Sequence, residues 1–253
     1  MTESTSEQRR RDLIRLAGAG AYWTYKAVLY FFSFLGPALV LHRFRASSAI
    51  VLLALAILGC GFAGLIFVAL LVITKKLLIG PVSAIGLHTI QTKEAQRWFS
   101  AAVVNAIAHE SPFRSLIVGL SPIASWYYRG MGARMPNSVM IAHGVLIRDP
   151  YFLECGENVT LGGGCFIMGH LGQGKEILLG RVIIEEGAVI GARAIISPDV
   201  HIGSHSVVAA GAVVARGTTI PDGETWGGVP ARKIMSTSRV ASSAVESGAE
   251  SKF

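Results

Sequence analysis

The sequence contains little cysteine and little charge, and each shortage excludes a class of protein. Three cysteines in 253 residues, Cys60, Cys155 and Cys165, cannot supply the disulfide framework of a small secreted domain. We expect them to be buried free thiols in a reducing compartment. Charged residues make up 15% of the chain, which carries a net charge of +7. In the second half of the chain, the basic residues are not clustered with aromatic residues. The sequence therefore gives no indication of nucleic-acid binding.

Two segments of the first half are apolar enough to cross a membrane, and together they explain the mean hydropathy of +0.51. Ala21–Leu41 carries one charge, Lys26, and Ala49–Thr74 carries none over 26 residues. As a helix the second segment is about 39 Å long, against a hydrocarbon core of about 30 Å. A cleaved signal peptide is the alternative for the first segment, but a second span follows at once and no cleavage site is clear. We predict a transmembrane hairpin over residues 21–76.

The arrangement of basic residues predicts the orientation of this hairpin. Lysine and arginine flank its two ends, at Arg9, Arg10, Arg11, Arg15, Lys26, Lys75 and Lys76. The short link between the spans carries only Arg43 and Arg45. We therefore expect a multi-pass protein of the cytoplasmic membrane, with residues 1–20 as a basic cytoplasmic N-terminus and both chain ends in the cytoplasm.

Residues 77–138 are predicted to form amphipathic helices at the membrane interface. The pattern of Thr92–Glu110 predicts a helix, and Ser115–Gly130 predicts a second one. The apolar face expected for the first helix consists of Trp98, Phe99, Ala102, Val103, Ala106 and Ile107.

Between Ile177 and Gly228 an apolar residue recurs at every sixth position, which is typical of a parallel β-helix. The series is Leu178, Ile184, Ile190, Ile196, Ile202, Val208, Val214, Ile220 and Trp226. Small or β-branched residues stand two positions before its members, as at Ala188, Ala194 and Ala212. We expect the large residue to fill the axis of a coil while the small one allows the backbone to turn a corner. The β-helix is predicted over residues 139–235, followed by a disordered tail at 236–253.

The same period exposes a break earlier in the chain. Leu146, Leu153, Leu161 and Ile167 are candidates for inward positions. The last two are six residues apart but out of phase with the series that passes through Leu178. We therefore predict that Met168–Glu176 is a loop that leaves the coil.

These features resemble the left-handed β-helix, or hexapeptide-repeat, acyltransferases. The resemblance rests on Gly169 and His170 in the loop, the Ile-Gly pairs at Ile190 and Ile202, and the ending at Gly228 to Ala231. The apolar first half is similar in arrangement to the membrane-anchored C-terminal modules of polylysine-synthetase-like proteins. The expected fold is thus a two-helix transmembrane hairpin with interfacial helices, followed by a left-handed parallel β-helix.

The resemblance implies transfer of an acyl group, usually acetyl, from a CoA thioester to a hydroxyl or an amine. His170 matches the family's catalytic histidine and would act as the general base. His143 is the second candidate. Asp149, Glu154 and Glu176 are the carboxylates that could orient the imidazole, and the sequence leaves the choice among them open.

The resemblance also implies that CoA lies in a groove between neighbouring coils of a homotrimer, with no metal ion required. The small residues that correspond to this groove are Ala192, Ala209, Ala210, Gly211, Gly227 and Gly228. Arg216, Arg232 and Lys233 could meet the phosphates. Trp226 and Val229 depart from the family pattern near the nucleotide end.

Because CoA is cytosolic, the predicted topology places the coil where the acyl donor is. A water-soluble acceptor would not require an anchor, so we expect a membrane-associated one, such as a lipid-linked sugar or a lipid. A trimeric membrane platform without catalytic activity is one alternative. The other is a zinc hydratase of the γ-carbonic anhydrase type, which would use His170, His201 and His205; the last two are expected at turns.

Overall fold

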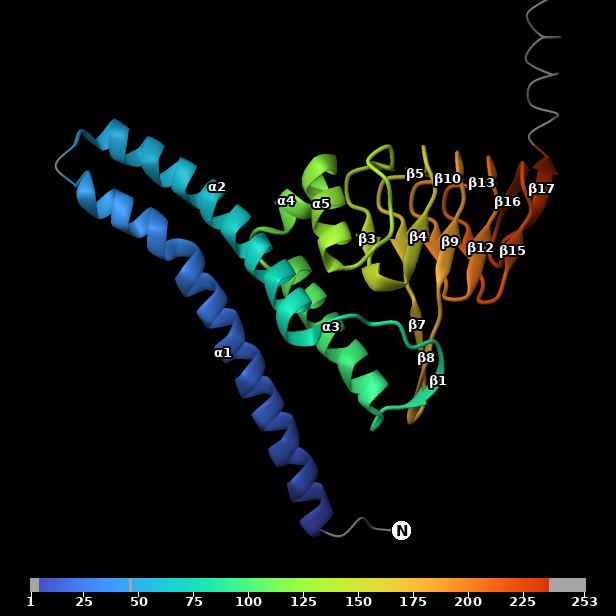
Figure 1. The fold of residues 1–253 in the computed structure, drawn as a ribbon, viewed down its shortest axis with the longest axis horizontal. Helices are drawn as coiled ribbons and strands as arrows, with labels where there is room; N and C mark the ends of the chain where they lie inside the picture. Colours follow the sequence, from blue (N-terminus) through green and yellow to red (C-terminus); the bar gives the residue numbers. More distant parts are fainter. Residues whose placement is uncertain (1–4, 46, 237–253) are drawn as a thin grey trace, which may run out of the picture. The chain divides into compact units, whose positions relative to one another are not determined.

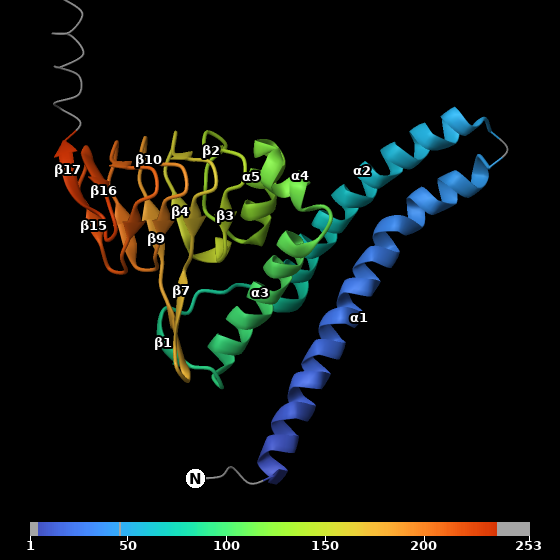
Figure 2. The same cartoon turned by 180° about the vertical axis from the view of Figure 1, so that it is seen from behind.

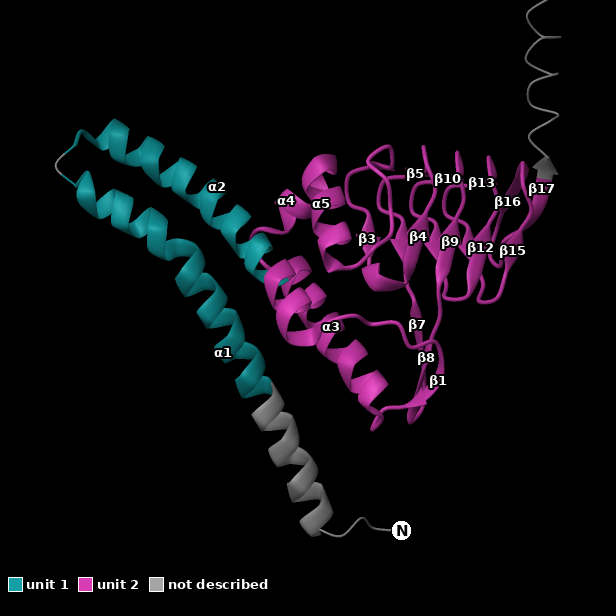
Figure 3. Cartoon of the chain, viewed as in Figure 1, with its two compact units in different colours: residues 1–71 teal, residues 72–253 magenta. Residues whose placement is uncertain are grey.

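The structure is a computed structural model that describes residues 5–45 and 47–236 (Figure 1). The chain divides into two compact units, residues 1–71 and residues 72–253 (Figure 3). The tail predicted to be disordered, residues 236–253, lies outside the described residues except for Ser236.

The first unit is a pair of long helices, α1 (Thr5–Arg43) and α2 (Ala49–Thr74). They contact one another through stacked rings of Tyr30 and Phe67, whose centroids are 5.1 Å apart. Many of their large apolar side chains are exposed, such as Ile50 at 81%. By length and composition, two helical segments could cross a membrane: Ala19–Arg43 and Ala49–Ile79.

Helices of the second unit pack against one end of the coil. The π-helix η1 (Lys75–Ile79) continues α2, and α3 (Lys93–Glu110) occupies the segment predicted as amphipathic. Thr92 caps α3 by accepting a hydrogen bond from the Ala95 amide. The predicted apolar face was wrong in part, because Phe99 is 61% exposed. Residues one step round the helix form the buried face: Ala95, Ala101, Val104, Asn105, Ile107 and Ala108.

The second predicted helix of this region is two helices, α4 (Arg114–Gly119) and α5 (Ser121–Met131). Leu120 between them is extended, with φ −121° and ψ 104°. Pro122 lies in the first turn of α5, where its missing amide hydrogen is tolerated, whereas a helix continuous with α4 would require that hydrogen.

From Met140 onward the chain coils through three parallel sheets that form the three sides of a β-helix (Figure 1). The first consists of β2 (Met140–Ile141), β5 (Thr160–Leu161), β10 (Val189–Ile190), β13 (Val207–Val208) and β16 (Glu224–Gly227). The second consists of β3 (Leu146–Ile147), β6 (Phe166–Ile167), β11 (Ile195–Ile196) and β14 (Val213–Val214). The third consists of β4 (Leu153–Cys155), β9 (Val182–Ile184), β12 (Val200–Ile202) and β15 (Thr219–Ile220); the 3₁₀ turn η2 (Pro150–Phe152) precedes it. An antiparallel strand, β17 (Arg232–Ser236), pairs with β16 at the end of the coil.

The six-residue series fills the axis of this coil from Ile184 onward. Ile184, Ile190, Ile196, Ile202, Val208, Val214 and Ile220 are each no more than 1% exposed. The small residues at Ala188, Ala194 and Ala212 are fully buried at the corners. Trp226 keeps the register by pairing with Val208, but it is only half-buried at the last turn.

The early coil belongs to the same axis, although its sequence is out of phase. Leu161 pairs with Ile190, and Ile167 pairs with Ile196. Leu178 was wrongly placed in the series, because it lies in a strand outside the coil. Leu146 was also wrong as an inward residue, since its neighbour Ile147 is the buried one.

The predicted loop at Met168–Glu176 is an antiparallel hairpin that leaves the coil and returns to it (Figure 2). Its strands are β7 (His170–Gln173) and β8 (Glu176–Leu179), joined through Gly174 with φ 62°. The strand β1 (Gly86–Thr89), which precedes α3, pairs with β8 and completes a three-stranded sheet. The segment before α3 is thereby fixed beside the hairpin.

Candidate active site

His170 is the first residue of the hairpin, at the point where the chain leaves the coil after β6. The preceding Gly169 passes so close to η2 that a Cβ on it would lie 2.7 Å from Cδ2 of Phe152. The same Cβ would lie 3.1 Å from Cβ of Asp149. Glycine therefore permits the close approach of the hairpin to the segment that carries Asp149.

Asp149 and His170 form a hydrogen-bonded pair. Nδ1 of His170 lies 2.6 Å from Oδ2 of Asp149, and the Gly169 amide donates to the same oxygen at 2.8 Å. Oδ1 of Asp149 accepts from Nε1 of Trp98 at 2.8 Å and from the hydroxyl of Tyr151 at 3.1 Å. The Asp149 side chain is fully buried, whereas that of His170 is 26% exposed.

These contacts keep Asp149 ionised and select the tautomer of a neutral imidazole at His170. Burial works to raise the pKa of Asp149, but hydrogen bonds from His170, Trp98 and the Gly169 amide outweigh it and hold that pKa below its usual value. Asp149 is thus a carboxylate at neutral pH, and a neutral His170 must carry its proton on Nδ1 to donate to it. Nε2 is then left with a lone pair, as a general base requires.

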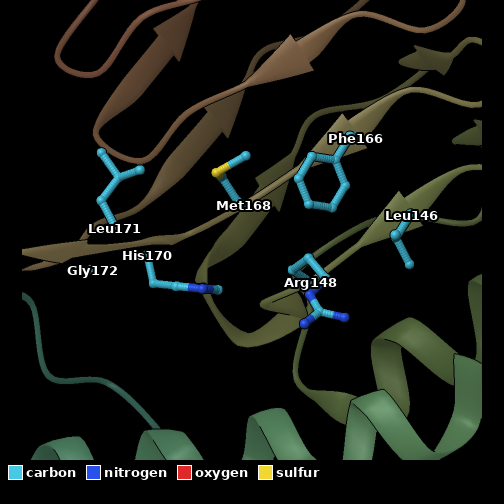
Figure 4. Close-up of a pocket in the computed structure, with 7 residues that line it drawn as sticks. All are labelled: Leu146, Arg148, Phe166, Met168, His170, Leu171 and Gly172. Carbon is cyan, nitrogen blue, oxygen red and sulfur yellow. The ribbon is translucent and has the colours of Figure 1, made fainter. Parts of the chain in front are cut away.

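The imidazole faces a cavity of about 380 Å³ on the outer surface of the second sheet (Figure 4). The cavity is lined by Leu146, Arg148, Phe166, Met168, His170, Leu171 and Gly172. Figure 4 shows the imidazole pointing from β7 toward the side of the cavity on which Arg148 lies. A reacting group could therefore approach His170 along an apolar wall that carries one cationic side chain.

Of the three carboxylates considered for orienting the imidazole, Asp149 is the one that contacts His170. Glu154 instead lies 3.3 Å from the guanidinium groups of both Arg134 and Arg181. Glu176 is exposed at the far end of the hairpin.

The other histidines are not brought to His170. His143 is exposed on the turn between β2 and β3 and does not line the cavity. His201 was wrongly placed at a turn, because it lies in β12, with Nε2 2.7 Å from Oε1 of Glu185. His205 does lie at a turn, with φ 55°. Among residues 5–45 and 47–236, no three His, Cys, Asp or Glu side chains are grouped as metal ligands.

The small residues predicted to line a CoA groove occupy one corner of the coil, after β10 and β13 and at the end of β16. Backbone hydrogen bonds connect the successive turns there: the Gly211 amide donates to Ala192 and the Val213 amide donates to Gly228. Ala192, Ala210, Gly211 and Gly228 are exposed, Ala209 is half-buried and Gly227 is buried. This corner and His170 lie at opposite ends of the strands of the second sheet. The corner comes before those strands, and the hairpin that begins with His170 follows one of them, β6.

The basic residues predicted to meet phosphates have partners within the chain. Arg216 lies 3.3 Å from Asp199, and Nζ of Lys233 lies 2.6 Å from Oε1 of Glu224. Trp226 donates to the other oxygen of Glu224. Arg232 is exposed and donates to the carbonyl of Ala231.

The fold is a parallel β-helix of the hexapeptide-repeat type, and sequence comparison identifies its family. The profile described as bacterial transferase hexapeptide (six repeats) matches residues 181–216. YvoF of Bacillus subtilis (strain 168), provisionally named an acetyltransferase, is 30% identical over 152 residues, or 58% of this chain and 82% of that protein. The chain belongs to the hexapeptide-repeat acetyltransferase family.

Other relatives share part of the chain. Delta-poly-L-ornithine synthetase of Acinetobacter baumannii (strain AB307-0294) is 25% identical over 54% of this chain and only 10% of that protein. This similarity agrees with the predicted likeness to polylysine-synthetase-like proteins. Gamma carbonic anhydrase 1 of Arabidopsis thaliana mitochondria is 38% identical over 52% of this chain and 50% of that protein. The Vibrio cholerae acetyltransferase VCA0836, solved with acetyl coenzyme A, superposes on 58% of this chain and 91% of its own, with 20% identity and a TM-score of 0.43.

Proposed function

We propose that the protein transfers an acyl group, most simply acetyl, from CoA to a hydroxyl or amine of a membrane-associated acceptor, with His170 as general base. The observation that carries this proposal is the Asp149–His170 pair at the edge of a cavity. The buried carboxylate holds the Nδ1–H tautomer, which leaves the lone pair of Nε2 on an imidazole that lines the cavity.

Acyl transfer requires a group that first accepts a proton from the acceptor and later donates that proton to the leaving thiolate. Nε2 of His170 removes the acceptor's proton as the acceptor oxygen or nitrogen attacks the thioester carbonyl carbon. The C–S bond then breaks, and the imidazolium returns the proton to the CoA thiolate as it leaves. Asp149 stabilises the imidazolium between these two steps without itself taking a proton.

The corner of small residues supports an extended ligand lying against the backbone. A Cβ added to Gly211 would meet nothing within 4 Å, so the surface there is open. Within one chain, His170 lies at the opposite ends of the second-sheet strands from this corner. The corner of one chain would therefore complete the site with His170 of another chain. A homotrimer with its grooves between neighbouring coils would provide that arrangement.

The apolar helices support a membrane location for the acceptor. We propose that residues 21–76 form a hairpin in the cytoplasmic membrane, that residues 77–138 lie at its surface, and that the coil of residues 139–235 faces the cytoplasm. This orientation follows from the basic residues that flank the hairpin, and it would give the coil access to CoA.

A turnover assay tests both parts of this proposal. The full chain in lipid nanodiscs should release free CoA from acetyl-CoA severalfold faster when an extract of bacterial membrane lipids is added. Mass spectrometry should then detect an extracted lipid or lipid-linked sugar that carries one more acetyl group. The matched control is nanodiscs of synthetic phosphatidylcholine without the extract.

Three outcomes separate the alternatives. Turnover that is equal with water-soluble sugars or amines would contradict the membrane acceptor alone. Failure to bind or hydrolyse acetyl-CoA would contradict the acyltransferase proposal and favour a non-catalytic trimeric platform. Stoichiometric zinc together with CO₂ hydration would favour a γ-carbonic anhydrase activity.

A further inference from the structure

Trp98, from helix α3, contacts both members of the proposed catalytic pair. Its indole Nε1 donates to Oδ1 of Asp149 at 2.8 Å, and its ring lies 4.7 Å from the imidazole of His170, centroid to centroid, at 55°. We propose that Trp98 is a positioning residue for acyl transfer: α3, which lies outside the β-helix, sets the orientation of the Asp149–His170 pair. This inference rests on the proposed function.

Hydrogen bonds hold helix α3 against the end of β3, the strand that leads to Asp149. They thereby fix the position of the Trp98 indole. Asn105, only 1% exposed, donates from Nδ2 to the carbonyls of Ile147 at 3.0 Å and Arg148 at 2.9 Å. The hydroxyl of Tyr127 donates to Oδ1 of the same amide at 2.8 Å. Two backbone carbonyls immediately before Asp149 are thus bonded to the helix that carries Trp98.

Each oxygen of the Asp149 carboxylate has its own donors. Oδ2 is bonded to His170 and to the Gly169 amide, and Oδ1 is bonded to Trp98 and Tyr151. Without the indole N–H, Oδ1 retains only the phenol, the longest of the four contacts at 3.1 Å. A buried carboxylate with an unfilled acceptor site can rotate toward another donor. Its bond to Nδ1 then no longer defines the plane of the imidazole.

The ring of Trp98 acts on His170 directly as well. An aromatic ring tilted against the imidazole restricts rotation of the side chain into the cavity. The same indole also packs against the buried cluster to which Ala95, Phe152 and Leu179 belong, so a purely structural role has to be separated from a positioning role.

Two substitutions make that separation. Trp98→Phe retains an aromatic ring but removes the N–H donor, and Trp98→Leu removes both. We expect Trp98→Phe to lower kcat on the order of 10-fold and Trp98→Leu on the order of 100-fold, with KM for acetyl-CoA changed less than about twofold. The control is Phe99→Leu, the exposed neighbour on α3, which should leave kcat and the thermal midpoint unchanged.

A spectroscopic measurement makes the inference testable even where turnover is slow. Nitrogen NMR of the full chain with labelled histidine should show His170, assigned by its loss in His170→Gln, as a single Nδ1–H tautomer. Trp98→Phe should convert it to a mixture of tautomers. Unchanged kcat and an unchanged tautomer in Trp98→Phe would overturn the positioning role. Full activity of His170→Gln would instead overturn the proposed base, which distinguishes the two failures.

Discussion

Replacing His170 with alanine is expected to lower acyl transfer by about 100- to 10,000-fold, because the acceptor loses the base that takes its proton. Affinity for acetyl-CoA should change little, since the small residues proposed to hold the extended ligand do so through their backbone, and His170 is not one of them. The measurement is release of free CoA from acetyl-CoA by the full chain in nanodiscs with membrane lipid extract, together with acetyl-CoA binding by calorimetry.

The matched control for this substitution is His143→Ala. His143 was the second candidate from the sequence, but it is exposed on a turn and does not line the cavity that contains His170. It should retain at least half of the native rate. A large loss in His143→Ala with full activity in His170→Ala would reverse the assignment and require an acceptor site at the turn between β2 and β3.

The coil was predictable because its inward-facing residues recur at a short, fixed spacing in the sequence. Each turn of the β-helix repeats the same inward and corner positions, so an axial residue such as Ile196 has counterparts six residues before and after it. The period also correctly located the place where the chain leaves the coil. It could not reveal what happens there, and the continuation of the series to Leu178 is a coincidence of spacing.

The hairpin itself was not predictable from local pattern, because its third strand comes from the distant segment before α3. Leu178 in β8 pairs with Leu87 in β1, far apart in sequence. Short apolar runs such as Glu176–Leu179 are compatible with several structures until a pairing partner is known. The buried face of α3 was misjudged for the same reason: the helix packs on elements that its own periodicity does not identify.

The candidate site also has parts that the sequence indicated and parts that it did not. His170 became the candidate base because it matches the catalytic histidine of the resembling family and follows glycine in the segment that breaks the period; its role stays a prediction. Asp149 remained one of three possible partners, since the choice depends on how η2 lies beneath the hairpin. Trp98 was assigned only to packing, because its contact with Asp149 depends on the tertiary position of α3. The Asn105 amide, buried in an otherwise apolar helix face, is the feature of the sequence that could have indicated this contact.

The second large effect is expected in the coil axis, from Ile184→Ala. Ile184 is fully buried and stacks in register between Cys155 and Ile202 of adjacent turns. Truncation removes apolar contacts from a coil whose neighbouring turns cannot close the gap independently, so we expect a loss of about 2–5 kcal/mol. The corresponding shift of the thermal midpoint of the second unit is about 5–15 °C, measurable by calorimetry.

The neighbouring Ile183 supplies a control of identical chemistry on the same strand. Its side chain points outward and is only half-buried, so Ile183→Ala should cost about 1 kcal/mol or less. The comparison isolates axial packing from strand propensity, because both substitutions replace the same β-branched residue within β9. Equal losses from the two substitutions would mean that the outer face of the third sheet is itself buried against a further surface.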